Sequence, residues 1–383
     1  MRVAIVHHWF VSQGGGERVA EVLAQMYPDA DLFTLVADRD KLPKSLRHRS
    51  LRTSFLDRAP FAPRVYRQLL ALYPLAVEHL DLSGYDLVLT SDSGPMKGII
   101  VSPSTVHICY CHSPMRYLWD QYHHYRTSMS RLSRSVFSLA AHYVRSWDQR
   151  AAQRVTHFVA NSSYVAARIR QYYGRDSTVI YPPVDVEISS LPFTSAPSGA
   201  YLTVGRLVPY KRIDLLIQAC NLLGCELRII GTGPEEGRLR SQAGNTIKFL
   251  GNVDEATLWE EYANCRAFIF AAEEDFGMAI VEAQGCGRPV IAFGKGGALE
   301  SVGCLDVTAP CPQDTGLFFY EQTAMAVADA ILRFEASEHC FQSHTIRERA
   351  GRFSAEVFRD SFQALVDTAL HAPSLTRELE ACK

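Results

Sequence analysis

Short runs of apolar and β-branched residues alternate in this chain with segments whose apolar residues recur at helical spacing. The first run, residues 3–6, is followed by the triplet Gly14-Gly15-Gly16 and by helical spacing over residues 17–26. A strand buried on both faces, a loop and a helix give this pattern, and repeats of such a unit build a parallel sheet covered by helices. The alternation therefore predicts an α/β fold.

The alternation continues on both sides of one interruption. In the first half, strands are expected at residues 31–36, 87–91, 98–101, 107–111 and 157–160. In the second half, strands are expected at 201–205, 227–231, 247–250, 267–271 and 289–293, with helices at 212–223, 257–264 and 278–284. The segment between the halves, up to Gly199, is rich in Pro and Ser, which is typical of a linker.

We therefore expect two Rossmann-like, doubly wound domains, at residues 1–185 and 199–352. A C-terminal helical segment, residues 353–383, can pack back on the N-terminal domain. The length of 383 residues, with 47% hydrophobic side chains, suffices for two cores.

Charge and cysteine usage narrow the class of protein. The formal net charge of -2 provides no overall positive field, so nucleic acid is not an expected partner. The ten cysteines include no C-x-x-C pair, which favours reduced, mostly buried thiols. Residues 1–10 read as a strand and not as a secretion signal, and no apolar run reaches membrane-spanning length. The expected location is the cytoplasm or the inner face of the cytoplasmic membrane.

The most specific local pattern is a pair of carboxylates, Glu274 and Glu282, separated by seven residues, with Gly277 at an expected helix start between them. A helix start offers unpaired N–H groups and a positive dipole end, which suit a diphosphate. The carboxylates could accept hydrogen bonds from sugar hydroxyls. Alternatively, the acidic flank only complements the helix dipole.

Two loops after expected strands of the second domain carry further candidates. Gly205 is followed by Arg206 and then by Lys211, and Gly231 opens a Gly-x-Gly turn. Because ligands bind at the carboxyl ends of strands in α/β sheets, the two cations could hold the phosphates of a nucleotide. Two cations beside a loop are equally typical of a solvated surface.

In the first domain, Gly15 and Gly16 allow the backbone to approach a phosphate or sugar closely. Their spacing is not that of the G-x-G-x-x-G fingerprint, which disfavours a nicotinamide dehydrogenase. His112 follows another expected strand and could contact a transferred sugar or an acceptor, although a structural role fits an isolated His as well.

Seven arginines between Arg116 and Arg154 are interleaved with aromatic residues. A helix of this kind can lie on an anionic membrane or receive a lipid diphosphate, and an ordinary solvated helix face has the same pattern. The D-x-D patterns at 29–31 and 38–40 are interpreted as surface acids, and no metal site is expected.

Taken in order, these motifs resemble the family-4 retaining glycosyltransferases of the GT-B fold over nearly the whole chain. The order runs from the Gly-rich loop and His112 through Asn161-Ser162-Ser163, Tyr181-Pro182-Pro183-Val184-Asp185, the Gly-Arg and Lys pair, Gly231-Thr232-Gly233-Pro234-Glu235 and Phe249-Leu250-Gly251-Asn252-Val253 to Glu274 and Glu282. The resemblance implies two Rossmann-like domains that face a central cleft.

The resemblance also implies roles for single residues. Arg206 and Lys211 match the pair that binds the donor diphosphate. Glu274 matches the carboxylate on the transferred sugar, and Glu282 matches the one on the ribose. His112 matches an active-site His near the donor sugar, although Ser-Pro follows it here. The other implied donor-binding positions are Gly15, Gly16, Gly231, Asn252, Val253, Phe276, Gly277, Met278 and Ala279.

The implied catalytic group comprises Glu274, His112, Arg206 and Lys211, with no metal and no other cofactor. Fixed cations and a helix start would meet the negative charge that develops on the departing nucleotide.

The runs His-Ser-Pro-Met-Arg-Tyr-Leu-Trp-Asp and Phe-Gly-Met-Ala-Ile-Val-Glu-Ala resemble bacterial mannosyltransferases that use GDP-mannose in surface-polysaccharide synthesis. This implies transfer of mannose to a glycan or a lipid-linked oligosaccharide. The alternatives are the same fold with a UDP-sugar donor, a sugar-nucleotide epimerase, and a non-catalytic nucleotide-sugar sensor. The two cations together with the two glutamates favour transfer.

Overall fold

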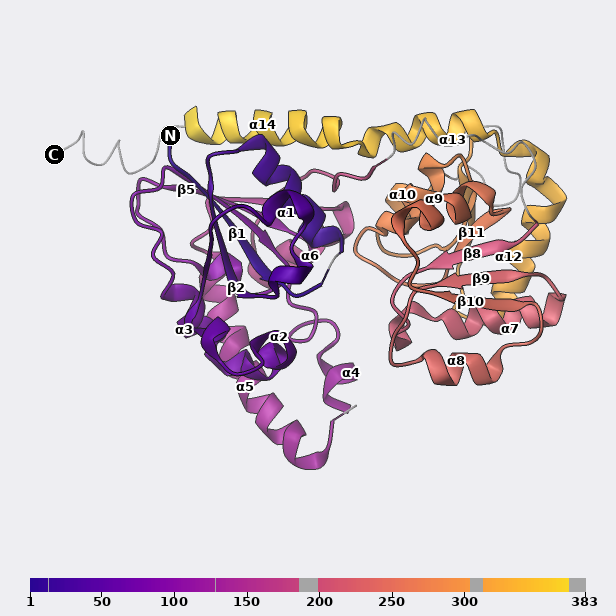
Figure 1. Ribbon diagram of the computed structural model, residues 1–383, viewed down its shortest axis with the longest axis horizontal. Coiled ribbons are helices and arrows are strands. Elements are labelled where there is room, and N and C mark those ends of the chain that lie inside the picture. Colours follow the sequence, from indigo (N-terminus) through magenta and orange to yellow (C-terminus); the bar gives the residue numbers. More distant parts are fainter. Residues whose placement is uncertain (13, 128, 186–198, 304–312, 372–383) are drawn as a thin grey trace. The chain divides into compact units, whose positions relative to one another are not determined.

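The computed structural model describes residues 1–12, 14–127, 129–185, 199–303 and 313–371. The chain forms two compact units (Figure 1). Unit 1 contains Met1–Pro183 and the chain from Phe358 onward, and unit 2 contains Val184–Val357. Helix α14 (Ala355–His371) begins at the end of unit 2 and continues in unit 1.

Unit 1 is built on a sheet of seven parallel strands. In chain order they are β1 (Val3–Phe10), β2 (Asp31–Ala37), β3 (Leu51–Thr53), β4 (Leu87–Asp92), β5 (Val106–Cys111), β6 (His157–Ala160) and β7 (Ser177–Val179). Their order in space is β3-β2-β1-β4-β5-β6-β7. The chain therefore extends the sheet on one side of β1 and then, after β3, on the other.

Helices cover both faces of this sheet. They are α1 (Gly15–Met26), α2 (Ala62–Val65), α3 (Tyr73–Glu78), α4 (Tyr122–Thr127), α5 (Arg131–Ala152) and α6 (Ser163–Tyr173), together with 3-10 helices that include η4 (Tyr66–Leu72) and η5 (Met96–Gly98). Side chains alternate along β1, so that Ile5 packs with α1 and α14 and Val6 packs with α3, η4 and α5. Figure 1 shows α1 and α14 on one side of the strands and α2, α3 and α5 on the other.

Helix α14 contributes part of the core of unit 1. Phe358, Phe362 and Val366 lie four residues apart, so they form one buried face of the helix. The ring of Phe358 lies 5.6 Å from that of Tyr110 on β5. Burial of each side chain of this size contributes about 1.5–3 kcal/mol. This packing attaches α14 to the sheet of unit 1.

Unit 2 repeats the same plan with six parallel strands. They are β8 (Tyr201–Val204), β9 (Leu227–Ile230), β10 (Ile247–Gly251), β11 (Ala267–Phe270), β12 (Val290–Phe293) and β13 (Gly316–Phe319), in the spatial order β10-β9-β8-β11-β12-β13. The helices are α7 (Ile213–Leu223), α8 (Glu236–Gln242), α9 (Glu255–Asn264), α10 (Met278–Gly285), α11 (Ala298–Ser301), α12 (Ala324–Ser337) and α13 (Ser343–Ala350). Helices α7 and α12 cover one face of the sheet, and α9 and α10 cover the other.

The predicted α/β class with two doubly wound parallel sheets is confirmed by these strand orders. The predicted strand at residues 98–101 is wrong, because η5 ends at Gly98 and the next strand begins at Val106. A Cβ atom on Gly98 would lie 2.3 Å from the ring of Trp147, so this segment packs directly against α5. Gly98 and Ile99 are buried beside this helix and do not belong to the sheet, whereas Ile100 is 50% exposed.

Candidate functional site

In unit 2 the direction in which the chain adds strands changes between β8 and β11. These two strands are neighbours, while β9 and β10 extend the sheet on one side and β12 and β13 extend it on the other. Ligands of doubly wound sheets bind at such a switch point, beyond the carboxyl ends of the strands. The loop after β8, with the 3-10 helix η6 (Pro209–Lys211), carries Arg206 and Lys211, and the loop after β11 carries Glu274.

Lys211 and Glu274 form an ion pair at this switch point, between Nζ and Oε1. Their side chains are only 14% and 19% exposed, so both charged groups are partly withdrawn from water. Lys211 Nζ also lies 5.3 Å from the centre of the Phe270 ring at the end of β11. Because water screens these charges less than it screens surface charges, they can act strongly on a bound anion or hydroxyl group.

Close backbone contacts fix the loops that carry this pair. Gly231, after β9, has a φ of +126°, and a Cβ atom there would lie 2.0 Å from the carbonyl oxygen of Gly205. Gly296, after β12, has a φ of +68°, and its Cβ would lie 2.4 Å from the carbonyl oxygen of Glu274. The same oxygen accepts a hydrogen bond of 2.8 Å from Gly297 N–H. Only residues without a side chain fit at the two left-handed positions, so the backbone of Glu274 has a defined place.

Helix α10 begins directly after this loop. Gly277 is its N-cap, and helix geometry leaves the amides of Met278 and Ala279 without an acceptor inside the helix. The buried ring of Phe276 packs edge-on against Phe353, with the ring centres 5.3 Å apart, and anchors the loop before the helix. The helix start is therefore held beside the Lys211–Glu274 pair.

Glu282 lies farther along α10 and is half-buried. Burial raises the pKa of its carboxyl group, whereas the hydrogen bond that it accepts from the Tyr262 hydroxyl, at 2.8 Å, lowers it. The carboxylate is therefore a positioned acceptor whose orientation is set by α9.

The remaining candidate positions of unit 2 follow neighbouring strands. Arg206 is exposed and has no ion pair with any residue that the structure describes. Asn252 Oδ1 accepts a hydrogen bond of 3.4 Å from the Thr232 hydroxyl, and Val253 packs against the core between the sheet and α10. All the unit 2 candidates thus lie on loops at the carboxyl edge or on α10, which begins there, although Arg206 does not join the Lys211–Glu274 pair.

His112, Gly15 and Gly16 lie in unit 1, near the corresponding switch point between β1 and β4. His112 Nε2 is 2.8 Å from the Ser91 hydroxyl, which is also 3.1 Å from His7 Nδ1 and donates to the carbonyl of Gly16 at 3.4 Å. A Cβ on Gly16 would lie 3.4 Å from His7 and 3.6 Å from His112. Ser91 therefore links two imidazoles and the start of α1.

Burial determines the charge of these imidazoles. Burial, together with neighbouring His8, lowers the pKa of His112 to about 3, while Asp92 opposes the shift. Burial also lowers the pKa of His7 well below its ordinary value. At neutral pH both rings are uncharged, so His112 can donate or accept a hydrogen bond but does not act as a cation.

The sequence patterns did not indicate the partners that hold the candidate residues. Gly296 and Gly297 had a usable signal, because a Gly-Lys-Gly-Gly run follows directly after an expected strand. Ser91 and Tyr262 had none, since each lies 20 or 21 residues from the candidate that it contacts and only the fold brings them together.

Replacing His112 by Gln should weaken the dependence of stability on pH in unit 1. Between the ordinary pKa of 6.5 and the folded pKa of about 3, the unfolded chain binds a proton that the folded chain does not. This contribution is fully present above pH 6.5 and is lost as the pH falls toward 3, by about 1.4 kcal/mol per pH unit. Urea unfolding followed by tryptophan fluorescence in a Trp259→Phe background reports on unit 1, because the other tryptophans lie there. An identical pH slope with and without His112 would contradict the shift.

Each half of the chain matches a glycosyltransferase family model. Residues 13–188 match the model described as Glycosyltransferase Family 4, and residues 197–353 match the model described as Glycosyl transferases group 1.

Curated relatives match over shorter segments. A D-inositol 3-phosphate glycosyltransferase of Segniliparus rotundus is 27% identical over 57% of this chain and 53% of its own length. A GDP-mannose-dependent monoacylated alpha-(1-6)-phosphatidylinositol monomannoside mannosyltransferase of Corynebacterium glutamicum is 29% identical over 37% of this chain and 45% of its own. A phosphatidyl-myo-inositol mannosyltransferase of Mycobacterium leprae is 35% identical over 33% and 38%. The chain thus spans about half the length of these relatives or less.

Solved structures show the same fold over nearly the whole chain. HepE of Anabaena in complex with UDP-glucose has a TM-score of 0.67 at 18% identity and covers 96% of this chain and 100% of that one. Sucrose-phosphate synthase from Thermosynechococcus elongatus has a TM-score of 0.69 at 19% identity, with full coverage of both chains. With a glycosyltransferase model on each half and two parallel sheets of related strand order, this chain belongs to the family-4 glycosyltransferases of the GT-B fold.

Proposed function

We propose that this chain is a retaining hexosyltransferase that moves mannose from GDP-mannose to a glycan or a lipid-linked oligosaccharide in surface-polysaccharide synthesis. The observation that carries the transfer reaction is the partly buried Lys211–Glu274 ion pair at the switch point of unit 2. A cation suited to a diphosphate and a carboxylate suited to sugar hydroxyls lie side by side in this pair, which supports the proposal.

The leaving nucleotide is the group that most needs stabilisation, because negative charge grows on its diphosphate as the bond to the sugar breaks. Lys211 Nζ and the first amides of α10 meet this charge in the proposed complex. Arg206 supplies a second cation from the exposed loop after β8. Because these groups are fixed cations and dipoles, the proposed reaction needs no metal.

In this proposal Glu274 accepts hydrogen bonds from the transferred sugar. When the diphosphate engages Lys211, the Glu274 carboxylate becomes available to accept hydrogen bonds from hydroxyls of the transferred hexose. Its backbone is fixed by the contacts with Gly296 and Gly297, so the carboxylate does not need to be ordered again on binding.

The other candidate residues complete the donor site. Glu282 binds the ribose, and the backbone at Asn252 and Val253 contacts the base. Gly231, Phe276, Gly277, Met278 and Ala279 shape the phosphate and sugar subsites. From unit 1, Gly15 and Gly16 approach the donor, and neutral His112 forms a hydrogen bond with the sugar or the acceptor.

The choice of mannose follows the relatives. Two of the curated proteins named above are mannosyltransferases, and one of them is called GDP-mannose-dependent. A UDP-sugar donor is the alternative within the same reaction. An epimerase or a nucleotide-sugar sensor would use the same two units without transfer to an acceptor.

Release of nucleoside diphosphate from GDP-mannose, UDP-glucose, UDP-N-acetylglucosamine and UDP-galactose tests this function. The full chain is incubated with each donor and a membrane-lipid and glycan acceptor extract, with and without a chelator. We expect release from GDP-mannose that requires the acceptor and is unchanged by the chelator. If only a UDP-sugar supports release, the sugar of that donor, and not mannose, is the one transferred. Donor isomerisation without acceptor, or binding without any turnover, would contradict transfer.

Glu274→Gln should lower kcat/KM by about 10²–10³-fold, because one charged contact to the transition state is worth roughly that factor. The neighbouring pair Lys295 and Glu273, 3.0 Å apart and more exposed, provides the matched control. Glu273→Gln removes a carboxylate from the adjacent position and should leave the rate within a few-fold of the parent. Comparable losses in the two variants would remove Glu274 from the sugar-contacting role.

A further inference from the structure

Unit 1 carries an exposed apolar surface that the proposed transfer reaction does not use. We define the α3/α5 surface by the exposed side chains of Leu72, Leu75, Val136, Leu139 and Tyr143. Leu139 is 75% exposed and Val136 is 64% exposed. Contiguous exposed side chains of this kind mark interaction sites more often than single ones do.

These side chains lie on elements that pack against one another. On α5, Val136, Leu139 and Tyr143 occupy positions i, i+3 and i+7, so they form one stripe along the helix. Leu72 ends η4 and Leu75 lies on α3, and both elements contact α5. Several apolar side chains are therefore presented together and are not scattered over the surface.

The segment that contains this stripe is strongly basic. Residues 116–154 carry seven arginines and two aspartates, a net charge of +5, whereas the whole chain carries -2. Positive charge is therefore concentrated in the segment that contains the apolar stripe.

Some of these arginines serve the fold. Arg134 donates to the carbonyl groups of Arg126 and Thr127 at 3.1 and 3.2 Å, and Arg145 donates to Leu118 at 2.9 Å while stacking over Tyr122. They hold the turn before α5 and the segment that leads to α4. Of the basic stretch considered from the sequence, Arg150 is exposed near the C-terminal end of α5.

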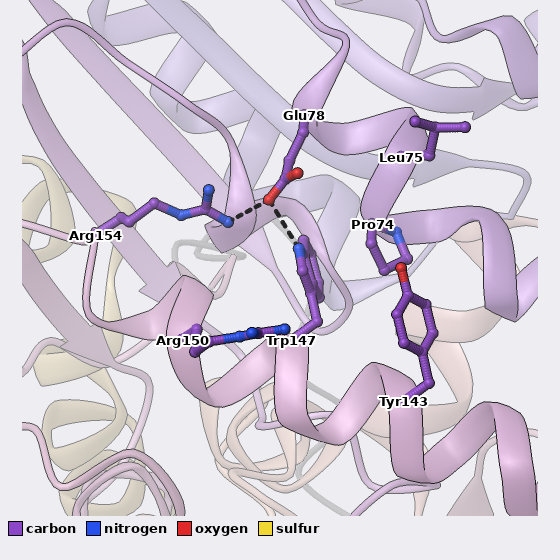
Figure 2. Close-up of a pocket in the computed structure, with 7 residues that line it drawn as sticks. All are labelled: Pro74, Leu75, Glu78, Tyr143, Trp147, Arg150 and Arg154. Carbon is purple, nitrogen blue, oxygen red and sulfur yellow. Dashed lines mark hydrogen bonds and ion pairs between the residues drawn. The ribbon is translucent and has the colours of Figure 1, made fainter.

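At that end, α3 and α5 line a hollow of ≈ 440 Å³ (Figure 2). Glu78 accepts hydrogen bonds from Arg154, at 2.7 Å, and from the Trp147 indole, at 2.9 Å. Arg150 lines the same hollow, is exposed, and has no ion pair with any residue that the structure describes. Figure 2 shows Leu75 and Tyr143 at the same hollow, so apolar and cationic groups adjoin here.

We propose that the α3/α5 surface docks this protein on a bilayer that contains anionic phospholipid. The apolar stripe enters the interfacial region of the bilayer. Arg150 and, beside it, Arg154 contact lipid phosphates. No helix within the described ranges is long and apolar enough to cross a membrane. The inference does not rest on the proposed transfer reaction, because binding to vesicles is measured without any sugar nucleotide.

Co-sedimentation of the full chain with vesicles tests the proposal. We expect binding to vesicles of phosphatidylglycerol and phosphatidylcholine, weaker binding to phosphatidylcholine alone, and partial release at high salt. Leu139→Ser combined with Tyr143→Ser should lower the partition coefficient about ten-fold or more. Arg150→Gln should lower it about five-fold, and only on the anionic vesicles.

Matched controls come from equally exposed residues elsewhere. Leu222→Ser combined with Leu332→Ser, on α7 and α12 of unit 2, and Arg39→Gln, in unit 1, should bind vesicles like the parent chain. Circular dichroism checks that each variant is folded. Failure of the parent to bind, or equal loss in the control pair, would overturn the proposal. Self-association that the Leu139 and Tyr143 substitutions abolish, without vesicle binding, would assign the surface to a second copy of the chain and would also overturn it.

Discussion

The parallel direction of the strands in each sheet is the constraint on which the rest of the structure depends. In unit 2 the carboxyl ends of all the strands lie at the same edge of the sheet, so loops that are far apart in sequence lie beside one another. Lys211 and Glu274 are 63 positions apart and meet because β8 and β11 are neighbours at the switch point. In unit 1 the same arrangement brings His7, Ser91 and His112 together from three strands or strand ends.

The two clusters differ in the chemistry that their surroundings allow. In the Lys211–Glu274 pair each partner compensates the partial burial of the other, so this site is suited to a charged ligand. Burial keeps His7 and His112 of unit 1 neutral, although Asp92 raises the pKa of His112 in part. The first cluster is therefore a candidate for charge stabilisation, and the second is a candidate for directional hydrogen bonding.

Much of this arrangement can be predicted from the sequence, because strands buried on both faces are continuous apolar runs and their loops follow directly. For this reason the sequence alone suffices to place Arg206, Lys211, Asn252 and Glu274 at strand ends. The strands β3 and β7 are short and only half-buried, so they leave no such run.

Residues whose role depends on distant contacts could not be found from the sequence. Gly98 belongs to an apolar run but packs under Trp147 and not in the sheet, and periodicity alone does not separate these cases. Arg134 and Arg145 have the same charge as Arg150, yet only the fold shows that the first two bind backbone carbonyl groups. Sequence pattern identifies where chemistry can occur, and tertiary packing decides which side chains are available for it.

The proposed function requires that the Lys211–Glu274 edge of unit 2 binds a nucleoside diphosphate. Thermal unfolding of the parent, Lys211→Ala and Lys295→Ala chains in the presence of GDP, UDP and ADP tests it most directly. A ligand at a hundred times its dissociation constant stabilises the folded state by about 2.7 kcal/mol. We expect GDP to stabilise the parent and Lys295→Ala chains, with or without a chelator, and we expect most of this stabilisation to be lost in Lys211→Ala. No response of the parent to any nucleotide, or an equal response of the Lys211→Ala chain, would contradict it.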